Sequence, residues 1–201
     1  MTIIITVSHG ICRSYSNRDC DRRAIAAARM LYQVLKARNC EAILHISSYH
    51  RSDLDVNVRD ARDNPWRVKI RDTITCSKRE VGAKDVFVID MHSFSPDTPA
   101  MGYLKLYFME TYVKSKLGPK EYRSWSDADR AWAWLAVTES VGDTNAKIVY
   151  GDGHNDIMID SILNGVGSVI LNVNESREIL PDIELQEFFE HLTDELLSKF
   201  C

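Results

Sequence analysis

The chain has 201 residues, of which 45% are hydrophobic and 27% charged, with a formal net charge of -4. This length is typical of one α/β domain, and the acidic balance argues against nucleic acid or an anionic membrane as the main partner. The N-terminal apolar run is too short for a signal peptide or a membrane span, so we expect a cytoplasmic protein. Because no repeat or linker interrupts the sequence, residues 1–201 are predicted to form a single domain.

The five cysteines are scattered and show no CxxC spacing. In a cytosol-like compartment they are predicted to be reduced thiols, and a thiolate metal site would need closer pairing. They are Cys12, Cys20, Cys40, Cys76 and Cys201.

The N-terminal half alternates short apolar runs with helical patterns. Residues Thr2–Val7 form a continuous apolar run, as expected for a strand that is buried on both faces. A helix is predicted from about Asp21 to Arg38, because alanines and leucines recur at helical spacing and form one buried stripe. The next predicted elements are a strand at Ala42–Ile46, a helix at Trp66–Arg79 and a strand at Val86–Met91.

The C-terminal half continues this alternation. The predicted elements are strands at Tyr103–Phe108, Lys147–Tyr150 and Val169–Val173, and helices at Ser126–Glu139 (with Asp129 in a capping box) and Asp156–Leu163. A last helix carries Leu185, Phe188, Leu192, Leu196 and Phe200 on one side. This order predicts a three-layer α/β fold, with a mostly parallel sheet covered by helices on both faces. Ligands of such sheets bind beyond the carboxyl ends of the strands.

Polar residues follow four of the predicted strands. They are Ser8-His9-Gly10 after the first strand, the charged stretch Tyr49–Arg59 after the second, His92-Ser93 after the third and Glu175 after the last. Two histidines and a carboxylate are the usual protein ligands of a hydrolytic zinc. A further glutamate near the metal can take a proton from water. An arginine with asparagine nearby suits a carboxylate on the substrate.

Each of these residues also has a purely structural interpretation. A histidine after a strand is often a hydrogen-bonded structural residue. Asp21 could cap the first helix, and Glu175 could be an ordinary loop acid. The charges between Arg51 and Arg62 could form a solvated surface of mixed sign. The functional interpretation therefore depends on the convergence of these side chains at one edge of the sheet.

At these positions the chain resembles the N-formylglutamate amidohydrolase family, within the zinc carboxypeptidase-like group. The resemblance consists of five short motifs that occur in the family's order and are spread over residues 8 to 175, which is most of the chain. They are Ser8-His9-Gly10, an acid at the start of the first helix (Asp21, with Asp19 as the alternative), the R-x3-D-x-N pattern of Arg51, Asp55 and Asn57, then Asp90-Met91-His92-Ser93, and Glu175.

The resemblance implies a zinc exopeptidase-like fold and a metal-dependent hydrolase that cleaves amide bonds in a small-molecule or peptide-like substrate. His9, Asp21 and His92 would bind zinc, and Glu175 would activate water. Asn57 and a neighbouring arginine, Arg51 or Arg59, would hold a substrate carboxylate. In the family an arginine directly follows the asparagine, whereas here Val58 does. The acyl group therefore stays open, and the N-acetylmuramoyl-alanine amidases, with a similar fold and zinc site, are a competing substrate class.

A rival interpretation comes from the stretch Gly151–Asp156 (GDGHND), which resembles the magnesium motif of haloacid dehalogenase-type phosphatases. Those enzymes also need a DxD motif whose first aspartate is the nucleophile, and Asp90-Met91-His92 has histidine in place of the second aspartate. Under the amidohydrolase interpretation, His154 and Asn155 lie on a loop that contacts the substrate, and under a purely structural one they form a Gly-rich turn before a helix. A third possibility is a binding protein that has kept a hydrolase fold without its activity, which metal content would distinguish.

Overall fold

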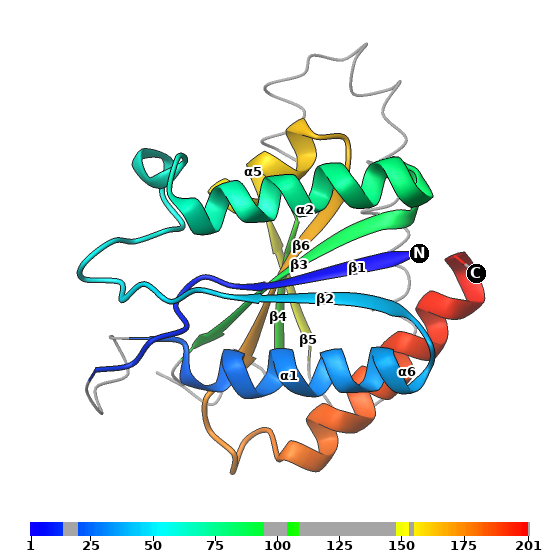
Figure 1. The fold of residues 1–201 in the computed structure, drawn as a ribbon. Helices are drawn as coiled ribbons and strands as arrows, with labels where there is room; N and C mark the ends of the chain where they lie inside the picture. Colours follow the sequence, from blue (N-terminus) through cyan, green and yellow to red (C-terminus); the bar gives the residue numbers. More distant parts are fainter. Residues whose placement is uncertain (14–19, 95–103, 109–147, 153–154, 201) are drawn as a thin grey trace.

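The computed structural model describes residues 1–13, 20–94, 104–108, 148–152 and 155–200. Six strands in these residues form one sheet in the order β2-β1-β3-β6-β4-β5 (Figure 1). The strands are β1 (Thr2–Val7), β2 (Glu41–Ile46), β3 (Val86–Phe94), β4 (Leu104–Phe108), β5 (Ile148–Asp152) and β6 (Gly167–Asn174). The helices are α1 (Arg22–Ala37), α2 (Pro65–Val81), α5 (Asp156–Leu163) and α6 (Asp182–Phe200), with short 3-10 helices at Arg59–Ala61 and Ala83–Asp85.

The sheet is mostly parallel, as predicted. Strand β1 pairs in parallel with both β2 and β3, and β3 pairs in parallel with β6. Strand β4 runs antiparallel to β6, and β5 follows the direction of β4. The carboxyl ends of β1, β2, β3 and β6 therefore lie at the same edge of the sheet.

Helices cover both faces of the sheet and give three layers (Figure 1). Helices α1 and α6 pack on one face, where Ile3 and Ile5 of β1 point into the core. Helices α2 and α5 pack on the other face, where Ile4 is buried. The alternation of β1 side chains between two cores explains why the whole strand is apolar. The predicted apolar stripe of α1 is confirmed, since Ala24, Ala27, Ala28, Leu31 and Leu35 are all buried.

Strand β3 is longer than predicted. The apolar pattern indicated an end at Met91, but the strand continues to Phe94. His92 and Ser93 stay in the sheet because they pair with Asn172 and Val173 of β6. The predicted helix at 126–139, including Asp129, lies outside the described residues. None of the described helices combines the length and hydropathy needed to cross a bilayer.

The prediction that all cysteines are reduced thiols is wrong for Cys12 and Cys20, which form a disulfide. Their Cα atoms are 5.1 Å apart, although the two cysteines are separated by 8 positions in the sequence. The Asp21 N–H donates a hydrogen bond to the His9 carbonyl (3.2 Å), which holds the two ends of this loop together. Cys40, which is buried, and Cys76, which is exposed, form no disulfide within the described part of the chain, and Cys201 lies outside it.

Candidate metal centre

His9, Asp21 and His92 come from three different elements and meet at the carboxyl edge of the sheet. His9 lies in the turn after β1, Asp21 immediately precedes α1, and His92 is near the end of β3. The glycine after His9 has a steric role, because a Cβ at Gly10 would lie 2.5 Å from Ile46 Cγ2 and 2.6 Å from the Ser47 carbonyl oxygen. The small residue thus lets the His9 turn pass close to the end of β2.

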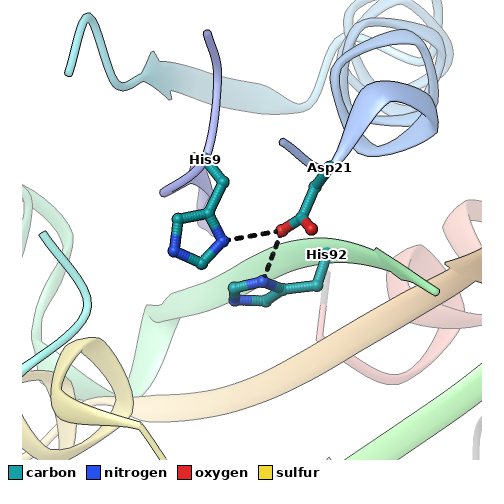
Figure 2. Close-up of side chains that lie close together, drawn as sticks. All are labelled: His9, Asp21 and His92. Atoms are coloured by element: carbon teal, nitrogen blue, oxygen red, sulfur yellow. Dashed lines mark hydrogen bonds and ion pairs between the residues drawn. The ribbon is translucent and has the colours of Figure 1, made fainter. Parts of the chain in front are cut away.

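The carboxylate of Asp21 points between the two imidazole rings, as Figure 2 shows. Asp21 Oδ2 lies 3.0 Å from His9 Nδ1 and 2.7 Å from His92 Nδ1. One donor atom from each of the three residues lies within 4.8 Å of the other two. The ring centroids are 5.5 Å apart and the rings are tilted by 65°. Two imidazole nitrogens and one carboxylate oxygen, all largely shielded from solvent, are a donor set that suits zinc.

Asp21 occupies the N-cap position of α1, but its side chain makes no capping hydrogen bond. Its carboxylate is directed instead to the two histidines. The capping interpretation of this side chain is therefore wrong. The alternative acid, Asp19, lies outside the described residues.

The outer nitrogen of each imidazole contacts a second carboxylate. His9 Nε2 lies 3.1 Å from Asp55 Oδ1, and His92 Nε2 lies 2.8 Å from Asp90 Oδ2. A neutral imidazole that donates its Nε2–H to a carboxylate has a free lone pair on Nδ1. Both inner Nδ1 atoms can then serve as ligands toward the same point beside Asp21.

Asp90 is fully buried, with an exposed fraction of 0%, and both of its oxygens are hydrogen-bonded. Oδ1 accepts hydrogen bonds from the hydroxyls of Thr6 (2.6 Å) and Ser8 (3.3 Å). Oδ2 contacts His92 and accepts from the Asn155 side-chain amide (2.5 Å). Such a carboxylate is held rigidly and orients the His92 ring.

The charges at this site strongly shift two pKa values. Burial alone would lower the pKa of His92, but the neighbouring Asp90 and Asp21 carboxylates raise it to about 10. Burial alone would raise the pKa of Asp21, but hydrogen bonds and charges from His92 and His9 lower it well below its usual range. The carboxylates thus favour a positive charge between them, either a proton on His92 or a metal cation.

Glu175 directly follows β6 and is held beside the end of β3. The Ser93 hydroxyl donates to Glu175 Oε1 (2.9 Å), and the Glu175 N–H donates to the Phe94 carbonyl (3.0 Å). Ser93 is the residue after His92, so Glu175 is anchored to the strand that carries a candidate ligand. It is not one of the three residues whose donor atoms form the cluster.

The predicted substrate-binding residues are only partly described. Asn57 Nδ2 lies 3.4 Å from His92 Nε2, and its Oδ1 is buried without a hydrogen-bond partner among the described residues. The Arg51 side chain, about half exposed, donates to Asp55 Oδ2 (3.3 Å). Arg59 begins a short 3-10 helix, but its side chain lies outside the described part of the chain, as does His154.

The sequence did not assign roles to Asp55 or Asp90 at this site, and it placed Asn155 on a substrate-contacting loop, whereas the Asn155 side chain donates to Asp90. A signal was present for Asp90, because residues two apart in a strand share a face and Asp90 is two residues before His92. Asn155 comes from the GDGHND stretch, and it also caps α5 by accepting from the Met158 N–H (2.9 Å). No comparable local pattern links Asp55 to His9, which are 46 residues apart.

The geometry argues against the phosphatase interpretation. An aspartate nucleophile must reach a phosphorus atom, and Asp90 is the residue that would have to do so. Its complete burial and its four side-chain contacts leave neither oxygen free to attack. The asparagine of the GDGHND stretch contributes to holding Asp90 instead.

No family model matches this sequence, and no curated protein matches it. Solved structures do resemble it. The gene product Atu2144 from Agrobacterium tumefaciens has a TM-score of 0.63 at 17% identity, covering 100% of this chain and 90% of that one. The CwlD amidase from Clostridioides difficile, in complex with the GerS lipoprotein, has a TM-score of 0.51 at 14% identity, with coverages of 99% and 97%.

A third structure is the catalytic domain of CwlV, an N-acetylmuramoyl-L-alanine amidase from Bacillus (Paenibacillus) polymyxa var. colistinus. Its TM-score is 0.49 at 13% identity, with coverages of 98% of this chain and 96% of that one. Identities this low establish similarity of fold alone. The chain therefore has an α/β fold that resembles that of the solved CwlD amidase.

Proposed function

We propose that this protein is a zinc-dependent hydrolase of amide bonds, in which His9, Asp21 and His92 hold the metal. The observation that carries the proposal is the orientation of the two imidazoles. Each directs Nδ1 toward Asp21 Oδ2 and Nε2 toward a separate carboxylate, Asp55 or Asp90. Histidines that bind zinc commonly make this second hydrogen bond, which fixes the tautomer and the ring. The similarity of fold to an amidase supports the same class of reaction.

Different residues of the site would have different roles in such a reaction. A zinc ion held by His9, Asp21 and His92 would, when bound, supply Lewis-acid chemistry that activates water near neutral pH. Asp55 and Asp90 hold the imidazoles in place. Glu175 accepts the proton of the attacking water and returns it to the leaving amine. Ser93 orients Glu175 by donating to Oε1.

The proposed substrate is a small or peptide-like amide, with an N-acyl amino acid as the first candidate. Asn57 offers a side-chain amide donor and a buried acceptor without a partner among the described residues, which suits a substrate amide or carboxylate. Arg51 and Arg59 are the proposed cations for a carboxylate, and His154 a further contact. Val58, which stands where the N-formylglutamate amidohydrolase family has arginine, is exposed. Muramyl peptides are the second candidate, on the similarity of fold to the CwlD amidase.

A metal-reconstitution assay tests this function. Protein stripped of metal is assayed on a panel of N-acyl amino acids and muramyl peptides, with and without zinc, while release of the free amine is measured. We expect hydrolysis of at least one substrate class only with zinc bound. Release of phosphate from a phosphoester that depends on magnesium would instead revive the phosphatase interpretation.

Changing Asp55 to asparagine is expected to weaken zinc binding about tenfold, the low end of what such outer partners contribute. Asparagine keeps an oxygen for the Asn57 N–H, which donates to Asp55 Oδ1 (3.0 Å), but removes the negative charge beside His9 Nε2. Zinc affinity is measured by competition with a chelator. The matched control is Asp53→Asn, because Asp53 is exposed and pairs with Arg13. Equal affinities in all three proteins would show that Asp55 does not support a metal ligand.

A further inference from the structure

Arg23 is a buried arginine in the first turn of α1, two residues after Asp21. Its guanidinium reaches the segment that joins β6 to α6. Nη1 donates to the carbonyls of Asn174 (2.7 Å) and Ser176 (2.9 Å). Nη2 donates to the Leu180 carbonyl and to the Asp182 carboxylate (3.0 Å).

The two carbonyls bonded to Nη1 belong to the residues on either side of Glu175. The backbone of Glu175 is therefore fixed on both sides by one guanidinium nitrogen. Its own N–H is bonded to Phe94 of β3, and its side chain accepts from Ser93. Arg23 thus connects the start of α1, where Asp21 lies, directly to the position of Glu175.

The charge of Arg23 is not needed to balance a buried acid. The carboxylate that it contacts within the described residues, Asp182, is about half exposed, and the other three acceptors are neutral backbone carbonyls. Burying a guanidinium costs free energy, and the hydrogen bonds of Nη1 and Nη2 offset part of this cost. Nε is buried without a hydrogen-bond partner among the described residues, so the contacts that Arg23 does make are those to the loop. A lysine has one nitrogen and cannot reproduce the planar fork that serves two sets of acceptors.

A second buried arginine makes the same type of contact at the other side of the site. Arg67 Nη1 donates to the carbonyls of Val56 (3.1 Å) and Val58 (3.3 Å), which flank Asn57. Glu175 and Asn57, which both have roles in the proposed reaction, are thus in the same situation. Each is flanked by two residues whose carbonyls bind a single buried guanidinium.

We propose that Arg23 is a positioning residue for Glu175, which it sets relative to the His9, Asp21 and His92 cluster by binding the carbonyls of Asn174 and Ser176. This inference rests on the proposed function, since it assigns Arg23 to the placement of the base in that reaction. It predicts that a change at Arg23 impairs catalysis through Glu175 and leaves the metal ligands intact.

The test compares Arg23→Lys and Arg23→Met with wild type. We expect each folded variant to keep its zinc but to lose about 10- to 100-fold in kcat, with a smaller change in KM, as displacement of a catalytic group produces. In a Glu175→Gln background, Arg23→Lys should cause little further loss, because the displaced group no longer acts. The matched control is Arg38→Met, since Arg38 also joins α1 to α6, through Asp194, without contacting the Glu175 segment.

Hydrogen exchange provides a readout that does not depend on activity. In Arg23→Lys the amides of residues 175–180 should exchange faster, while those of β1 and β3 should keep wild-type rates. Asp182→Asn, which keeps Arg23 but weakens a half-exposed partner, should show a smaller effect of the same kind. Hydrogen exchange in Asp182→Asn therefore tests the role of the Arg23 contacts even if the Arg23 variants do not fold.

The outcomes separate the inference from the proposed function. If Glu175→Gln loses turnover but the Arg23 and Asp182 variants match wild type in kcat and in exchange at 175–180, the positioning role is wrong and the function stands. An equal loss from Arg23→Lys with and without Glu175 would also overturn it, because the effect would then not act through Glu175. If Glu175→Gln keeps normal turnover, the proposed reaction itself is wrong.

Discussion

Replacing His92 by alanine is expected to abolish zinc binding and amide hydrolysis together. Three protein side chains form the candidate site, and His92 supplies one of its two nitrogen donors. Its loss also leaves Asp90, a fully buried carboxylate, without the imidazole at 2.8 Å. Zinc per chain and turnover should therefore both fall to background in this variant.

The double variant with His9→Ala should be little worse than either single variant, because both remove the same ion and the effects of such residues do not add. His45→Ala is the matched control. His45 is a buried histidine of the neighbouring strand β2 that contacts Thr73 and lies outside the cluster. A His92→Ala variant with wild-type turnover would contradict the proposed zinc-dependent hydrolysis.

Replacing Glu175 by glutamine is expected to lower turnover at least about a hundredfold, the low end of what general acid–base catalysis contributes. The attacking water must lose a proton and the leaving amine must gain one, and an amide side chain can do neither. Glutamine keeps an Oε1 that can accept from the Ser93 hydroxyl, so the fold and the bound zinc should be unchanged. The effect should fall on kcat more than on KM, because the proton moves only in the transition state.

The matched control for this change is Glu178→Gln, since Glu178 is an exposed acid in the same connection between β6 and α6. Turnover and bound zinc are compared across the three proteins on a substrate that the wild type hydrolyses. Near-normal turnover of Glu175→Gln would remove Glu175 from the mechanism, whatever the metal content.

Elements with a local sequence pattern could be predicted with nearly correct bounds. The strand β1 and the helix α1 are examples. Burial of a strand on both faces gives a continuous apolar run, and burial of a helix on one face gives apolar residues at helical spacing. The end of β3 could not be located in this way. Its last residues, His92-Ser93-Phe94, stay in the sheet through pairing with β6, which lies about 80 residues later in the chain.

The candidate site was predictable for a geometric reason. Parallel strands end at one edge, so His9 and His92 had to lie near each other once both were placed at strand ends. The contacts that orient them were not predictable, because Asp55 reaches His9 only through the path of the loop after β2. The disulfide between Cys12 and Cys20 and the contact of Arg23 with Asn174 likewise depend on how the packed chain brings separate segments together.

His9, Asp21 and His92 are proposed to hold one zinc ion, and the metal content of the purified protein is the most direct measurement of this site. The protein is purified without added metal, equilibrated with one equivalent of zinc, desalted, and measured by elemental analysis alongside His92→Ala. We expect about one zinc per chain in the wild type and almost none in the variant. A folded wild-type protein that retains no zinc, or a His92→Ala variant that retains as much as wild type, would contradict it.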